Sequence, residues 1–181
     1  MKITEKDPTG FTLIEVLVYA FLVGLFSVIL LLNLRGAQTN ASVLERASLG
    51  VVSDFRKAQN LTLSGLTFQG NTVCGYGIHY LDPSSYLIYA GGEVTCGSAD
   101  RNYQSGSDFN VQTVKITESN VKFKSSFSDV FFESPDPKTF INNSFSLSVT
   151  ALAISIGFEN MNCPAGCKTI NVFPSGRIDL N

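Results

Sequence analysis

The sequence predicts an α+β protein, in which a long N-terminal helix precedes an antiparallel, β-rich head. Three observations support this fold class. Residues 16–34 form a run of 19 uncharged, mostly apolar residues. Residues 44–61 continue with apolar side chains at helical spacing, and after Gly65 short strand-like segments separated by turn residues replace the helical pattern. We expect four parts: a leader over 1–10, an apolar helix over 11–34, an amphipathic helix over 35–64 and a head over 65–181.

The composition narrows the class of protein. Only 15% of the 181 residues are charged, well below the ~25% of an average soluble domain, and the net charge is -2. This balance gives no general attraction for nucleic acids. The chain has 14 Phe and 6 Tyr besides many aliphatic residues, which excludes an intrinsically disordered protein. Abundant Ser, Thr and Asn beside few Lys and Glu are typical of an exported domain with a polar surface.

The apolar run is long enough to cross a membrane. As a helix it would extend about 28 Å, close to the thickness of the hydrocarbon core. A cleaved signal peptide is one alternative, although its apolar part would be only about 7–15 residues long. The nearest approach to its cleavage signal is Thr39-Asn40-Ala41. A single-pass anchored domain that never polymerises is the other alternative.

A single carboxylate, Glu15, lies at the start of this apolar helix. Near the bilayer centre a carboxylate costs about 2.5–3.5 kcal/mol on insertion scales, so it needs a partner. No Lys, Arg or His follows within two helical turns. Cleavage after Gly10 would create an α-amine on Phe11. That amine would lie one turn from Glu15 of the same chain and within reach of Glu15 in a neighbouring copy.

The segment Gly-Phe-Thr-Leu-Ile-Glu-Val-Leu at residues 10–17 resembles the cleavage and methylation motif of type IV pilins and type II secretion pseudopilins. The resemblance implies that a prepilin peptidase cleaves between Gly10 and Phe11 and N-methylates Phe11. It also implies that Glu15 guides the docking of subunits into a filament. The leader departs from the family pattern because Lys2 and Lys6 are balanced by Glu5 and Asp7, so the positive-inside rule gives no orientation.

The same resemblance implies a structural subunit of a type IV pilus or a secretion pseudopilus. Its partners would be other pilin or pseudopilin subunits, the prepilin peptidase, an inner-membrane assembly platform and membrane lipid. It would be a single-pass protein of the bacterial inner membrane with its head outside the cytoplasm, and would reach the periplasm or the cell surface in a filament.

Two further features favour a minor subunit. Major pilins commonly carry a proline in the apolar half of the helix, whereas here none occurs between Pro8 and Pro83. Phe131-Phe132 followed by Pro135, together with the segment 170–178, is similar to the C-terminal region of H-type minor pseudopilins and their pilus relatives.

The second half of the helix carries one apolar stripe at spacings of three and four residues: Leu44, Ala47, Val51, Phe55, Ala58 and Leu61. We expect this stripe to pack on the protein's own sheet rather than in a coiled coil with a partner. The helix should end at Ser64, with Gly65 as its C-cap.

Strand patterns dominate the head. Residues 74–81 and 86–90 flank a turn at 82–85, and pairing Leu81 with Tyr86 places Cys74 opposite Glu93, close to Cys96. Residues 97–110 read as a loop. Further strands are expected at 111–117, 121–127, 130–133, 145–158 and 168–173, with a breaker at 134–137 and a final turn at 174–177 before residues 178–180.

Four cysteines allow three disulfide pairings. We favour Cys74 with Cys96 and Cys163 with Cys167, because this choice closes two local loops. Metal binding is the alternative, but these spacings are poor for a zinc site, and an exported domain favours disulfides.

The sequence carries no catalytic motif, and we expect neither a cofactor nor a metal. His79, the only histidine, lies within a strand pattern, so a structural or surface role is expected. Asp129, Glu133, Asp136 and Asp179 are scattered and expected to be solvated. A calcium site in the 97–110 loop would match no loop signature. The protein is therefore expected to be a substrate of the prepilin peptidase rather than an enzyme.

An alternative function is a binding module at the filament tip, for adhesion or DNA uptake. Lys115, Lys122 and Lys124 are its candidate nucleic-acid cluster, with Phe123 pointing away from Lys122 and Lys124.

Overall fold

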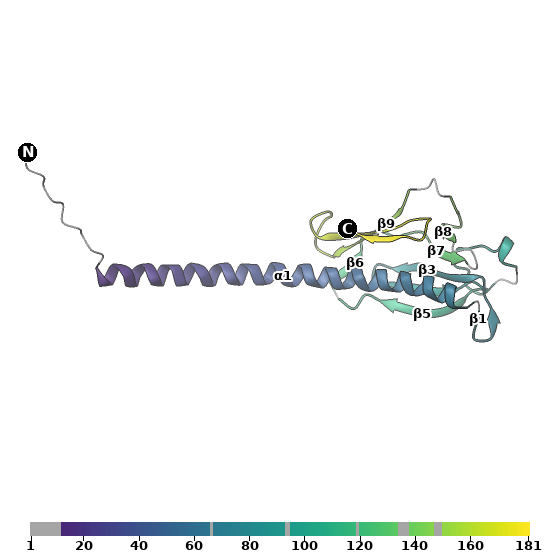
Figure 1. The fold of residues 1–181 in the computed structure, drawn as a ribbon, viewed down its shortest axis with the longest axis horizontal. Coiled ribbons are helices and arrows are strands. Elements are labelled where there is room, and N and C mark those ends of the chain that lie inside the picture. The colour runs from purple at the N-terminus through teal and green to yellow at the C-terminus, as the bar shows by residue number, and fades with distance from the viewer. Residues whose placement is uncertain (1–11, 66, 93–94, 119, 134–137, 147–149) are drawn as a thin grey trace, which may run out of the picture. The chain divides into compact units, whose positions relative to one another are not determined.

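The computed structural model describes residues 12–65, 67–92, 95–118, 120–133, 138–146 and 150–181, with the side chains of 32–39 left aside. The expected leader over 1–10 lies outside these residues. The chain comprises two compact units, Met1–Ala41 and Ser42–Asn181. Helix α1 (Leu13–Ser64) begins in the first unit and ends in the second, where antiparallel strands follow it (Figure 1). The α+β fold class is confirmed.

The strands of the second unit form three antiparallel sheets. The largest has the order β5-β4-β3-β7-β8, the second has the order β11-β10-β9-β6, and β1 and β2 form a small ribbon. The bounds are β1 Thr67–Phe68, β2 Asn71–Thr72, β3 Gly75–Asp82, β4 Ser85–Ala90, β5 Phe109–Lys115, β6 Val121–Phe123, β7 Val130–Glu133, β8 Lys138–Ile141, β9 Leu152–Phe158, β10 Cys167–Val172 and β11 Ile178–Leu180, with a short 3-10 helix, η1, at Cys96–Ser98.

The apolar stripe of α1 packs on the protein's own sheets, as the sequence predicts. Leu44, Ala47, Val51, Phe55 and Ala58 are buried, and Leu61 is partly buried against the same core. Both large sheets contribute to this core, through residues such as Ile78 of β3 and Ile170 of β10. The helix ends at Ser64, before Gly65, as expected.

Two hydroxyl groups lie buried on the same helix face and remain hydrogen-bonded. Ser48 donates to the carbonyl of Leu44 at 2.8 Å. Thr62 donates to the carbonyl of Ala58 at 3.0 Å and accepts the N–H of Tyr76 at 3.1 Å. Since a buried polar group without a partner is costly, these bonds make the face compatible with the core and tie α1 to β3.

The expected register of the first hairpin is wrong by one residue. Tyr80, rather than Leu81, pairs with Tyr86, and Asp82 pairs with Ser85. The Asp82 carboxylate closes a tighter turn, because it accepts the N–H of Ser84 at 2.7 Å and the hydroxyl of Ser85. These bonds, that of Ser85 above all, hold the pKa of Asp82 below its usual value. Leu81 is left as the extra residue of a bulge.

Other strand boundaries also differ from expectation. The strand at 130–133 is confirmed, but β5 begins at Phe109, β6 ends at Phe123, and β9 begins at Leu152 rather than residue 145. The ribbon β1-β2 and strand β8 were not expected. β8 pairs with β7 and is followed by Asn142 and Asn143, both with positive φ of 51° and 57°. Two asparagines suit such a turn, so the signal was present in the sequence. The expected breaker at 134–137 lies outside the described residues.

Two buried tyrosines of β4 anchor this sheet through their hydroxyls. Tyr86 donates to Oδ2 of Asp54 at 2.5 Å, and Tyr89 donates to the carbonyl of Arg101 at 2.6 Å. Burial raises the pKa of both phenols far above the ordinary value, and the Asp54 and Asp129 carboxylates add to the effect for Tyr86 and Tyr89 respectively.

We predict that stability falls steeply in alkali. Above about pH 10 these tyrosines ionise in the unfolded state but stay protonated in the folded state, so each removes about 1.4 kcal/mol per pH unit. Denaturant unfolding of the detergent-solubilised chain between neutral pH and about pH 11 measures the slope. Tyr86→Phe should reduce the slope by one tyrosine's share; an unchanged slope would contradict the assignment.

Candidate functional site

The first candidate is the apolar part of α1. Residues Leu13–Leu31, 19 in number, are by length and composition able to cross a membrane, and none of them is buried. Leu13 is 81% exposed and Phe21 67%. A continuous apolar surface of this kind is unfavourable in water, so lipid or other protein must cover it. The segment fits a single-pass membrane anchor.

The polar groups of this segment are handled within the helix. Ser27 donates to the carbonyl of Val23 at 2.7 Å. Thr12 precedes the first turn, and its carbonyl and Oγ1 accept the N–H of Glu15 at 3.0 and 3.4 Å. Thr12 and Glu15 therefore have the spacing of a capping box, in which the helix dipole favours a carboxylate. The sequence contains this signal, but reasoning from it sought a partner for Glu15 outside the helix.

Glu15 is half-buried in the first turn of α1, and no described residue donates a hydrogen bond to its carboxylate. The capping role uses its backbone and leaves this carboxylate available. Gly10 and Phe11, the expected cleavage and methylation residues, lie outside the described residues. The pairing of Glu15 with a new α-amine on Phe11 therefore stays a prediction.

The head contains both disulfides that the sequence favours. Cys74 is bonded to Cys96 and Cys163 to Cys167, each with a Cα–Cα distance of 5.2 Å. The first joins the start of β3 to η1, and the second closes the turn before β10. No cysteine is left for a metal. The chain is thus cross-linked in the way that exported domains commonly are.

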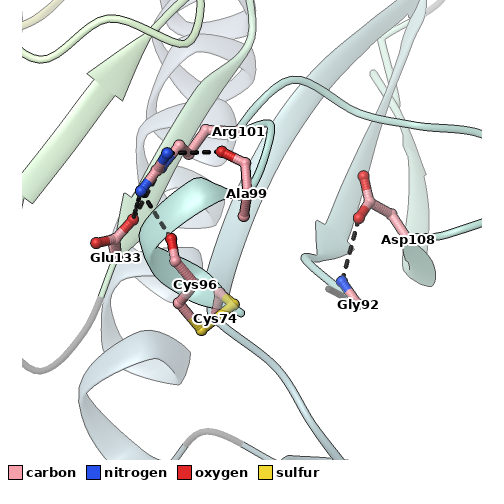
Figure 2. Close-up of a disulfide and its surroundings, with 7 residues drawn as sticks. All are labelled: Cys74, Gly92, Cys96, Ala99, Arg101, Asp108 and Glu133. Carbon is pink, nitrogen blue, oxygen red and sulfur yellow. Dashed lines mark hydrogen bonds and ion pairs between the residues drawn. A yellow bond between two sulfur atoms is a disulfide. The ribbon is translucent and has the colours of Figure 1, made fainter. Parts of the chain in front are cut away.

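Arg101 holds the loop that follows the first disulfide (Figure 2). Its guanidinium donates to the carbonyls of Cys96 at 2.9 Å and Ala99 at 2.6 Å, and pairs with Oε2 of Glu133 at 2.8 Å. It also lies 4.5 Å from the centre of the Phe140 ring. One side chain therefore ties η1 and its loop to β7 and β8, a role that no sequence motif signals.

His79 takes part in a second structural cluster. Its Nδ1 lies 2.7 Å from Oδ1 of Asp129, while Oδ2 of Asp129 accepts the N–H of Tyr103 at 2.6 Å. The Tyr103 ring lies 4.8 Å from the imidazole. Asp129 thus joins β3 to the loop after η1, and the structural role expected for His79 is observed.

The expectation of solvated carboxylates is wrong for three residues, since Asp129, Glu133 and Asp179 are all paired. Asp179 pairs with Arg177 at 3.0 Å. Each pair joins residues that strand pairing brings together, which single-sequence reasoning cannot locate. Asp136, the fourth, lies outside the described residues.

The 97–110 loop uses its acidic side chains internally. Asp108 accepts the N–H of Gly92 at 3.1 Å and that of Gln104 at 2.7 Å (Figure 2 shows the first). Within the described ranges, no group of three or more His, Cys, Asp or Glu side chains could hold a metal ion.

The candidate nucleic-acid cluster is largely occupied. Lys122 pairs with Oε1 of Glu159 at 2.5 Å, and Lys124 donates to the carbonyl of Phe158 at 2.7 Å. Phe123 points into the core, as expected. Lys115, at the end of β5, is exposed, and the structure does not bring the three lysines together as one basic patch.

We predict that Arg101→Met lowers the free energy of unfolding by about 3 kcal/mol, because it leaves the largely buried Glu133 unpaired. Arg177→Met is the matched control, since Arg177 also pairs with a carboxylate and lies 4.0 Å from the ring centre of Phe173, but is exposed. Its loss should be below about 1 kcal/mol. Denaturant titration followed by near-ultraviolet circular dichroism compares the two. Equal losses would contradict a special role for Arg101.

Comparisons with models of protein families, with curated proteins and with solved structures found no significant match. What stands is architectural: an N-terminal apolar helix followed by antiparallel sheets, which is compatible with a pilin-like protein. The family and the function are therefore argued from the residues.

Proposed function

We propose that the protein is a structural, minor subunit of a type IV pilus or type II secretion pseudopilus. It is made as a prepilin, cleaved after Gly10, N-methylated at Phe11 and assembled through α1. The observation that carries the proposal is the exposed apolar segment Leu13–Leu31, which follows directly on the motif at residues 10–17 and leads into a head with a core of its own.

Assembly follows from the chemistry of this segment. While the subunit is in the membrane, lipid covers the apolar side chains. In a filament, apolar faces of neighbouring helices replace the lipid. Glu15 is the one charge among residues 12–31, and the positive amine of Phe11, from the same chain or a neighbour, would neutralise it. Requiring that pairing gives the helix a preferred axial position among its neighbours.

The head contributes what the helix does not. Its core closes against α1, so it presents a folded surface whichever filament the helix enters, and its loops give the subunit its particular contacts. The two disulfides suit a position outside the cytoplasm, at the outer side of the inner membrane and then in the periplasm or at the cell surface.

The N-terminal peptide of the protein from its native membrane provides the first test. We expect it to begin at methylated Phe11, as measured by mass spectrometry. A protein that still begins at Met1 would contradict the prepilin proposal and favour a single-pass anchored domain that does not polymerise.

The second test separates membrane insertion from assembly. Glu15→Leu removes the one charge of the segment, so we expect normal membrane insertion but at least about a tenfold loss from the filament fraction. Ser27→Ala is the control, because its hydroxyl bonds only within its own helix. Immunoblots of membrane and sheared-filament fractions give both readouts. Unchanged incorporation of Glu15→Leu would exclude the proposed role of this carboxylate.

A further inference from the structure

Four cations on one side of the head have no acidic partner. Arg46, Arg56 and Lys57 lie on α1 and Lys115 at the end of β5; all four are exposed, and none forms an ion pair within the described residues. We call these four the basic face. Lys57 donates to Oε1 of Gln112 at 2.6 Å, which fixes α1 beside β5.

Basic residues elsewhere in the head are engaged. Arg101, Lys122, Lys168 and Arg177 form ion pairs, the third with Glu45 at 3.1 Å, and Lys124 binds a carbonyl. The basic face is therefore distinguished by the absence of compensation rather than by the number of its cations.

The charges of the head divide unequally. Asp54 and Glu118 are the acidic residues that border the basic face, and Asp54 accepts the hydroxyl of Tyr86. Four cations against two anions leave this side positive. The rest of residues 42–181 carries ten acidic and six basic residues, so it is negative. One copy of the head thus presents a positive side and a negative remainder.

The basic face is also hollowed. Arg46 and Lys115 line a cavity of about 150 Å³ together with Asp54 and Tyr86. Gly50 belongs to its lining, and a side chain there would meet nothing within 4 Å, so the glycine keeps the hollow open. An acidic side chain entering from outside would find two cations there without having to break an existing ion pair.

We propose that the basic face docks on the acidic remainder of a neighbouring copy of this chain. The inference rests on the proposed filament function, which places copies side by side. Two basic faces repel each other, so the contact joins different surfaces of the two copies, and contacts of that kind repeat along a line instead of ending at a pair. Nucleic acid fits less well, because Asp54 and Glu118 interrupt the positive charge and Tyr86 is only 1% exposed.

Zero-length cross-linking tests the contact directly. The full chain, purified from its native membrane in unlabelled and ¹⁵N-labelled form, is mixed in detergent, reconstituted into liposomes and treated with a carbodiimide, which joins lysines to adjacent carboxylates. We expect mixed-isotope cross-links from Lys57 and Lys115 to acidic residues of the other copy. Intermolecular links confined to Lys122, Lys124 or Lys168 would overturn the inference while leaving the subunit role intact. The absence of any intermolecular link would overturn it as well.

Charge reversal supplies the matched variants. Arg56→Glu with Lys57→Glu should weaken self-association about tenfold at low salt and lose these links. Arg177→Glu, equally exposed but on the far side of the charge division, should change neither. An unchanged double variant overturns the inference. So does duplex DNA that is retained by the immobilised chain and released by the double variant, since nucleic acid would then be the occupant. Failure of the proposed function itself is read separately, from Met1 retained at the N-terminus.

Discussion

The buried face of α1 between Leu44 and Ala58 packs against both large sheets at once, and the remaining structure of the head follows from that shared contact. The face is apolar except where Ser48 and Thr62 bind carbonyls, so helix and sheets meet without an unpaired polar group. The disulfides, the Arg101 cluster and the Asp129 cluster all lie beyond this contact and fix loops that it does not reach. The helix is thus the element on which the sheets are assembled.

Periodicity alone was enough to predict the helix, its buried stripe and its end, because helical spacing is a local property of the sequence. The cysteine pairs were also predictable, since each closes a short loop. The register of the first hairpin was not, because it depends on how the Asp82 side chain folds back on its own turn. Strand β8 was missed although Asn142 and Asn143 announce its turn, because it is short and follows two prolines.

The candidate sites divide in the same way. The membrane segment and Glu15 are visible in the sequence, and so is the capping relation of Thr12 to Glu15, once the helix is known to begin at Leu13. The ion pairs of the head are not visible, because each partner comes from a different strand or loop. Which cations remain unpaired therefore becomes known only from the structure, and this is why the lysines singled out by clustering in the sequence are mostly not those of the basic face.

The interleaving of the two sheets has a consequence for biosynthesis. β6 pairs with β9, while β7 and β8, which lie between them in the chain, belong to the other sheet. The amphipathic half of α1 is made early, yet Glu45 meets Lys168 and Gln59 meets the carbonyl of Gly176, 117 residues later. During translocation the apolar stripe is thus without its complete cover until almost the last residue has crossed. For that interval, the nascent subunit exposes a sticky helix outside the membrane and depends on rapid export or on a holding factor.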